Sequence, residues 1–251
     1  MRYLPHTDET RAAMLERIGV ADMAALFADI PQQARRGGLK TLPGFQGEWD
    51  VDAHLSALAA KNRAAGDGPF FIGGGAYRHH VPASVDHLIQ RSEFLTAYTP
   101  YQPEISQGTL QVLFEFQTQV ARLTGMEVAN ASMYDGSTAC AEAVLMAARV
   151  KRRKKIVICG NLHPHYRETS KTLGRFSGLN IEVTPPLPGG APELAGLVDK
   201  DTAALVVQNP DAFGQLRDLT PLAEAAHEAG ALLIAVVTEP VSLGLLRSPG
   251  A

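Results

Sequence analysis

Four short runs of aliphatic and β-branched residues in the second half of the chain constrain its fold more than any other feature. They lie at residues 154–160, 180–184, 202–209 and 231–237. Helices are predicted between them, over residues 163–176, 190–200 and 219–230. Strands that are apolar on both faces and alternate with helices form a mostly parallel sheet covered on both sides, with right-handed crossovers. The sequence therefore predicts an α/β domain.

The first third of the chain has a helical pattern broken by loops. Helices are predicted over residues 8–20, 21–31 and 50–66, where apolar residues recur at helical spacing. Asp8 and Asp22 are the expected N-caps, and Pro31 is expected to stop the second helix. A longer helix is predicted from residue 105, ended by Gly125.

These patterns divide the chain into two regions. We expect a helical N-terminal arm with loops over residues 1–90 and a partial α/β large domain over residues 91–251. Because no closing helix follows the last predicted strand, we expect the large domain to be C-terminally truncated.

Composition excludes several classes of protein. With 45% hydrophobic residues, 20% charged residues and a net charge of −3, the 251-residue chain is an ordinary globular sequence without a basic excess for nucleic acid. The cations of "VKRRKK" end a predicted helix, where they favour the helix dipole. No apolar run reaches the roughly 18 residues of a membrane span, and the start lacks the apolar core of a signal peptide, so we expect a cytoplasmic protein.

The two cysteines, Cys140 and Cys159, form neither a disulfide framework nor a metal motif. Buried thiols are expected instead. Three consecutive glycines, residues 73–75, indicate a tight turn or a close approach of the backbone to a ligand.

The segment "SMYDGSTACAEA" contains the first candidate site. Gly136, Ser137 and Thr138 lie where a loop becomes a helix, so their N–H groups and hydroxyls could hold an anion such as a phosphate. Serine and threonine are also common N-caps, and on spacing alone capping is the favoured interpretation.

Further candidates follow the predicted strands, on the edge of an open sheet where ligands bind. His163 and His165 in "CGNLHPHYRET" could stack on a ring or carry a proton. No nearby side chain completes a metal ligand set with them, and a structural histidine at a helix start is the alternative. "VVQNPD", with Asn209 and Pro210, follows another strand.

A proline-bounded loop, "YTPYQPE", precedes the long helix. Tyr98, Thr99, Tyr101 and Gln102 offer hydroxyl and amide groups on a stiff backbone. Such a loop can reach a partner's site, although tyrosines in loops are also common interface residues without a catalytic role.

Two groups that pyridoxal-phosphate (PLP) chemistry requires are missing from their usual places. A fold of this kind that uses PLP needs a lysine for the Schiff base and an acid facing the pyridine nitrogen. Thr238 and Glu239 end the strand that usually supplies an aspartate. No lysine follows that strand: the lysines are Lys40, Lys61, Lys151, Lys154, Lys155, Lys171 and Lys200.

The segment "YTPYQPEISQGTLQVLFEFQTQVARLTGMEVANASMYDGSTACAEA" resembles the glycine cleavage system P-protein family, glycine dehydrogenase (decarboxylating). Within it, the similarity is to the α subunit of the split bacterial form. "FIGGGAYRHHVPASV", "SLGLLRSPG" and the opening "YLPHTDETRAAMLERIGV" fit the same family, so the resemblance covers essentially the whole chain.

The resemblance implies a fold-type-I PLP-dependent transferase fold in a subunit that has lost its own cofactor. PLP would be bound by subunit 2, and the resemblance implies an α2β2 assembly of the two subunits. No catalytic residue or metal is expected on this chain. Gly136, Ser137 and Thr138 would be a vestigial phosphate turn, and His163 would stand at the ring-stacking position.

The family reaction decarboxylates glycine through PLP and passes the aminomethyl group to the lipoyl arm of H-protein. The loop with Tyr98, Thr99, Tyr101 and Gln102 would form part of the active-site wall at the subunit interface. Two alternatives stay open: an independent PLP enzyme with its lysine in a missing C-terminal part, and a purely structural scaffold subunit.

Overall fold

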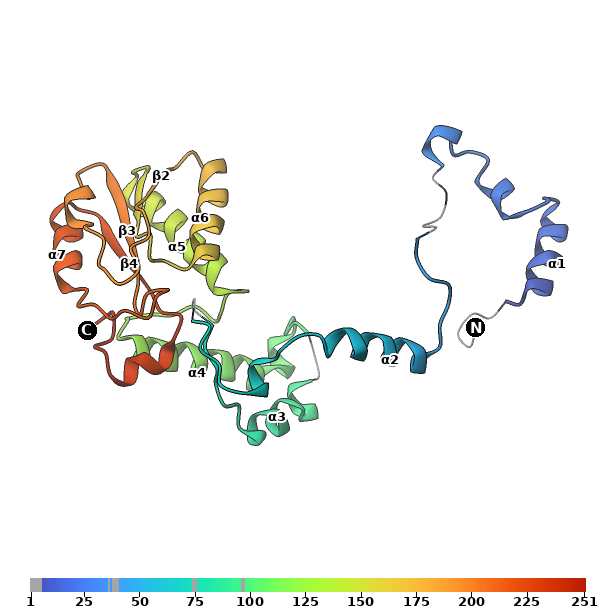
Figure 1. Ribbon diagram of the computed structural model, residues 1–251, viewed down its shortest axis with the longest axis horizontal. Helices are drawn as coiled ribbons and strands as arrows, with labels where there is room; N and C mark the ends of the chain where they lie inside the picture. Colours follow the sequence, from blue (N-terminus) through green and yellow to red (C-terminus); the bar gives the residue numbers. More distant parts are fainter. Residues whose placement is uncertain (1–5, 36, 38–40, 74–75, 96–97) are drawn as a thin grey trace. The chain divides into compact units, whose positions relative to one another are not determined.

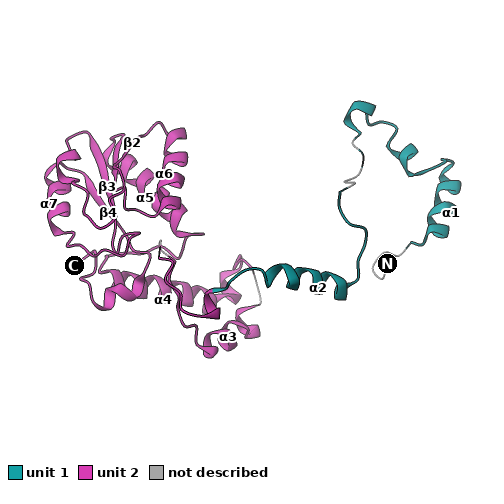
Figure 2. Cartoon of the chain, in the orientation of Figure 1, with its two compact units in different colours: residues 1–64 teal, residues 65–251 magenta. Residues whose placement is uncertain are grey.

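The computed structural model describes residues 6–35, 37, 41–73, 76–95 and 98–251. The chain divides into two compact units, residues 1–64 and 65–251 (Figure 2). The predicted division at residue 90 stays a prediction.

The first unit contains only helices and loops among its described residues. Its elements are α1 (Asp8–Ile18), η1 (Met23–Phe27), η2 (Gln32–Ala34) and α2 (Glu48–Ala59). Thr7 caps α1, since its hydroxyl accepts a hydrogen bond from the Thr10 N–H at 3.2 Å. The prediction of Asp8 as the cap was wrong by one residue: Asp8 lies in the first turn, where a carboxylate favours the dipole.

The second predicted helix is shorter than expected. Asp22 is its N-cap, as predicted, and accepts the Ala25 N–H at 2.9 Å. However, the element is a 3₁₀ helix that ends at Phe27, so Pro31 does not stop it. So short a segment cannot offset the cost of nucleating an α-helix, and none of its residues is buried against a core.

The second unit begins with short helical elements. They are η3 (Ala65–Asp67), α3 (Ala83–Ile89), η4 (Ser92–Phe94) and η5 (Pro103–Ile105). The predicted long helix is α4 (Gln107–Thr124), and Gly125 caps it with a φ of 71°, which confirms that prediction. Gly73 has a φ of 70°, and the other two glycines of the triplet lie outside the described residues.

The predicted parallel sheet is present (Figure 1). Its strands are β1 (Lys155–Ile158), β2 (Asn180–Val183), β3 (Thr202–Gln208) and β4 (Leu232–Val236). Their order is β2-β1-β3-β4, and every neighbouring pair is parallel. β3 is central and all of its residues are buried, as expected for a strand covered on both faces.

Helices cover both faces of this sheet. The helix α5 (Gly136–Lys151) packs with α6 (Pro164–Phe176) on one face, around Val144, Ile158 and Val206. The helix α7 (Thr220–Glu228) packs on the other face, around Leu205 and Ala226. These two apolar layers hold the sheet and fix the positions of the loops at its edges.

One crossover differs from the prediction. The helix expected over residues 190–200 is only a 3₁₀ turn, η6 (Ala195–Leu197). Pro192 and Gly196 disfavour a helix there. The buried side chain of Leu194 covers that part of the sheet instead.

Candidate functional site

The carboxyl ends of the four parallel strands meet at one edge of the sheet, and the loops after β1, β3 and β4 lie there. This is the edge at which open α/β sheets bind ligands. His163, Asn209 and Thr238 all follow strands at this edge, in agreement with the sequence patterns.

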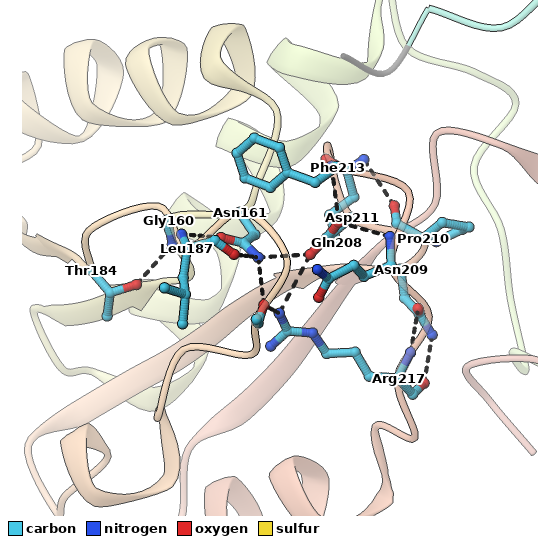
Figure 3. Close-up of polar contacts among 12 residues, drawn as sticks. Gly160, Asn161, Thr184, Leu187, Gln208, Asn209, Pro210, Asp211, Phe213 and Arg217 are labelled. Carbon is cyan, nitrogen blue, oxygen red and sulfur yellow. Dashed lines mark hydrogen bonds and ion pairs between the residues drawn. The ribbon is translucent and has the colours of Figure 1, made fainter. Parts of the chain in front are cut away.

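Asn161, Asp211 and Arg217, whose side chains are buried or nearly buried, connect the loops after β1 and β3 (Figure 3). The Asn161 amide donates to Asp211 Oδ2 at 2.7 Å, and Arg217 Nη2 lies 3.4 Å from the same oxygen. The exposed fractions of Asn161 and Asp211 are 0% and 1%. A buried charge of this kind is stable only when it is paired and hydrogen-bonded. The cluster therefore has a structural role, which is to fix the loops after β1 and β3.

The loop after β3 folds around its own side chains. Asp211 Oδ1 accepts the backbone N–H groups of Phe213 and Gln215 at 2.9 and 3.0 Å. The Asn209 amide exchanges two hydrogen bonds with the Arg217 backbone, at 2.9 and 3.1 Å (Figure 3). The Asn209–Pro210 bond is cis. The polar side chains expected at this ligand-binding edge thus form hydrogen bonds within the loop itself.

Gln208 links three strand ends from a fully buried position. Its Oε1 accepts the backbone N–H of His163 at 2.8 Å. Its Nε2 donates to Pro210 O at 2.9 Å and to Thr238 Oγ1 at 3.0 Å. The sequence predictions missed Gln208, Asn161, Asp211 and Arg217. A polar residue placed at or just after the end of an apolar strand is the signal that would have indicated the first three.

His163 is the N-cap of α6. Its Nδ1 accepts the His165 N–H at 3.2 Å, and its ring centroid lies 5.1 Å from the His165 ring and 5.3 Å from the Tyr166 ring. Within the part of the chain that the structure describes, no three His, Cys, Asp or Glu side chains are grouped as a metal site would require. The ring-stacking role of His163 stays a prediction.

The first turn of α5 is capped by Asp135, which the sequence patterns had not indicated. Its Oδ1 accepts the Thr138 N–H at 2.8 Å and the Ser137 hydroxyl at 2.6 Å. These two hydrogen bonds hold the pKa of the Asp135 carboxyl below its usual value. The sequence favours serine and threonine as the caps, but in the structure Ser137 and Thr138 donate hydrogen bonds to the cap, Asp135.

Tyr166 brings the α5 turn and His163 together. Its hydroxyl lies against Gly136, where it would overlap an added Cβ, and its ring contacts the His163 ring. Burial is the main cause of a raised Tyr166 pKa. The phenol is therefore neutral near pH 7.

The tyrosine loop before α4 is exposed. The side chains of Tyr98 and Tyr101 are 101% and 88% exposed. The described hydrogen bonds of the loop are local: the Tyr101 N–H donates to Thr99 O at 2.9 Å, and the Ile105 N–H to Gln102 O at 3.3 Å. This compact loop presents its aromatic side chains outward.

Cys140 and Cys159 are free and buried, as predicted. Burial raises the pKa of both thiols. The described helices include none with the length and apolar character needed to cross a bilayer.

Comparison with known proteins identifies the family. The family model described as "Glycine cleavage system P-protein" matches residues 1–251. The chain belongs to this family. A relative from Maricaulis maris named "Probable glycine dehydrogenase (decarboxylating) subunit 1" is 62% identical over 250 residues, which is 100% of this chain and 56% of the relative. The chain thus spans about half the length of the curated relatives it matches.

Solved structures support the fold. A glycine decarboxylase (P-protein) of the glycine cleavage system, in inhibitor-bound form, is 47% identical with a TM-score of 0.78, covering 100% of this chain and 56% of that one. A sphingosine-1-phosphate lyase from Burkholderia pseudomallei is 16% identical with a TM-score of 0.55, covering 82% of this chain and 50% of that one. The predicted fold-type-I PLP-dependent transferase fold is confirmed.

The described residues at this edge of the sheet do not fit PLP. Where an acid would face the pyridine nitrogen, Thr238 bonds Gln208, and the Glu239 carboxylate lies 2.9 Å from His79 Nε2. Lys155 begins β1 at the opposite edge of the sheet, and Lys171 pairs with Glu168 on α6. Among the described residues, no lysine follows β4 to form a Schiff base.

Proposed function

We propose that this chain is a partner subunit that lacks its own cofactor and completes a PLP site on another chain. The whole enzyme would decarboxylate glycine and transfer the aminomethyl group to the lipoyl arm of H-protein, in an assembly such as α2β2. Membership of the P-protein family supports the reaction class. The name of the Maricaulis relative, "subunit 1", supports a partner subunit.

One observation supports the location of the contribution. The side chains of Tyr98 and Tyr101 are exposed on a loop whose backbone forms its own hydrogen bonds and continues into the 3₁₀ turn η5. Exposed aromatic side chains on a rigid backbone lose little entropy on binding, and tyrosine is enriched at the centre of interfaces.

The chemistry would be divided between the chains. PLP on the partner chain supplies the electron sink for decarboxylation. The Tyr98 and Tyr101 hydroxyls and the Gln102 amide of this chain would hydrogen-bond at the wall of that site, and the rings would exclude water from it. This division needs no lysine on the present chain.

The experiment replaces Tyr98 and Tyr101 by phenylalanine in the complex reconstituted with subunit 2. Phenylalanine keeps the ring and removes only the hydroxyl. We expect glycine decarboxylation to fall by about 10- to 100-fold, since one lost transition-state hydrogen bond costs about 1.4–2.7 kcal/mol. The assembly measured by sedimentation should stay unchanged.

Tyr134→Phe is the matched control, because Tyr134 is also fully exposed but lies outside the loop. It should retain full activity. Unchanged decarboxylation in Tyr98→Phe/Tyr101→Phe would contradict the proposal and favour a purely structural scaffold. Activity of this chain without subunit 2 would favour an independent enzyme.

A further inference from the structure

The first turn of α5, Gly136–Thr138, has the form of a phosphate cradle, but an internal anion uses its donors. The Asp135 carboxylate accepts the Ser137 hydroxyl at 2.6 Å and the Thr138 N–H at 2.8 Å. The Ser137 N–H interacts with the same carboxylate. The groups that would bind a phosphate are therefore occupied by a side chain of like charge.

A second side chain fills the space in front of the turn. The Tyr166 hydroxyl lies against Gly136, and the Tyr166 Cζ atom would be only 2.6 Å from a Cβ built there. Gly136 thus accommodates a phenol of the same chain, in the position where a cradle glycine would let a phosphate approach the backbone.

Tyr166 cannot easily move away. Its ring contacts the His163 ring at a centroid distance of 5.3 Å and packs on the core beside Cys140 and Val144. The backbone N–H of His163 in turn donates to the side chain of the buried Gln208. The blocking phenol is thus part of the packed α5–α6 layer.

We propose that Asp135 and Tyr166 together close this chain's own phosphate turn, so that a phosphorylated coenzyme cannot occupy it. Asp135 excludes the phosphate by charge and by taking its donors, and Tyr166 excludes it by volume. This inference deepens the proposed function and rests on it, because it explains how a fold-type-I chain leaves the coenzyme to its partner.

The test measures binding of pyridoxine 5′-phosphate and of pyridoxine to the 251-residue chain by calorimetry. Neither compound has an aldehyde, so neither can react with surface lysines, and only the first carries a phosphate. We expect the wild-type chain to bind both equally weakly. In Asp135→Gly/Tyr166→Leu, the phosphorylated compound should bind at least 10-fold more tightly, with no change for pyridoxine.

These substitutions are chosen to keep the fold. Glycine is tolerated as an N-cap but has no side-chain oxygen to occupy the donors of the turn. Leucine keeps an apolar side chain on α6 but lacks the Cζ atom and the hydroxyl that lie against Gly136. Asp218→Gly is the matched control, because Asp218 is another carboxylate that accepts an N–H at a helix start, from Thr220 at 2.9 Å. It removes the same charge without opening the α5 turn and should gain no phosphate binding.

Two results would overturn the inference: a wild-type chain that already prefers the phosphorylated compound by 10-fold, or a double variant that gains nothing. The proposed function fails separately, in the decarboxylation assay of the tyrosine-loop variants.

Gly136→Ala provides an independent measurement. Alanine at an accessible helix position normally stabilises, but here the new methyl group meets Tyr166, so the thermal midpoint should fall. Gly108→Ala in α4 is the control, since a Cβ there meets nothing within 4 Å and its midpoint should not fall. A rise in the Gly136→Ala midpoint would show that the turn is open and would contradict the closure.

Discussion

The helices α4 and α5 are both long and belong to the same unit, yet they are stabilised differently. Five residues of α5 are buried, against the sheet and α6. No described residue of α4 is buried, although Leu113, Phe116 and Leu123 lie on one face of it. Phe116 is 43% exposed. α5 therefore has its core within this chain, whereas the apolar face of α4 is the kind of surface that a partner would cover.

This difference means that the residues that stabilise the chain and the residues proposed to act in function lie in different segments. The buried residues and the cluster of Asn161, Asp211 and Arg217 belong to the sheet, to its loops and to α5, α6 and α7. The segments before α5 carry most of the exposed aromatic residues, including those of the tyrosine loop. A subunit that completes another chain's site needs this division, since its core must be its own while its functional surface faces the partner.

The largest effect is expected from breaking the cluster of Asn161, Asp211 and Arg217, which holds the loops after β1 and β3 at the edge of the sheet. Asp211→Ala leaves the nearly buried Arg217 guanidinium without its counter-ion and removes the acceptor for Asn161 and two backbone N–H groups. The free energy of unfolding should fall by about 3–5 kcal/mol, measured by urea denaturation.

Asp218→Asn serves as the control for this measurement, because Asp218 is an exposed carboxylate in the same segment and its loss should change stability by less than about 0.5 kcal/mol. An Asp211→Ala variant as stable as the wild type would mean that the network does not hold the loops together.

Two substitutions with smaller effects compare the core of the sheet with the exposed face of α4. Leu205→Ala at the centre of β3 creates a cavity in a fully buried position and should cost about 2–5 kcal/mol. Phe116→Ala on α4 removes a half-exposed ring and should cost less than about 1 kcal/mol in this chain alone.

The same Phe116→Ala variant sharpens the comparison when the partner is present. If a partner covers α4, the substitution should weaken the complex by at least 10-fold in a titration of the two subunits, while Leu205→Ala should act mainly on folding. Equal costs for the two variants in the isolated chain would remove the distinction between the core of the sheet and the exposed face of α4.

Much of the fold follows from local patterns in the sequence. The strands and α5, α6 and α7 are predicted because their apolar periods match the layers they build. The α-helices predicted at residues 190–200 and 21–31 are only short 3₁₀ elements in the structure. Their apolar residues have helical spacing, but proline, glycine or the lack of a packing surface outweighs the pattern.

The candidate site was harder to predict, because its state depends on contacts between distant residues. The glycine, serine and threonine of the α5 turn indicate a phosphate cradle, yet Tyr166, on the next helix, lies against it. Asn161 and Asp211 are far apart in sequence and meet only after the sheet has formed. No periodicity or motif encodes such a pairing.

The most direct test of the account is covalent capture of the coenzyme. The isolated chain is incubated with PLP and reduced with borohydride, and its lysines are mapped by mass spectrometry beside those of subunit 2. The account predicts a stoichiometric adduct on subunit 2 and none on this chain. A stoichiometric adduct on one lysine of this chain, with glycine decarboxylated in the absence of subunit 2, would contradict it.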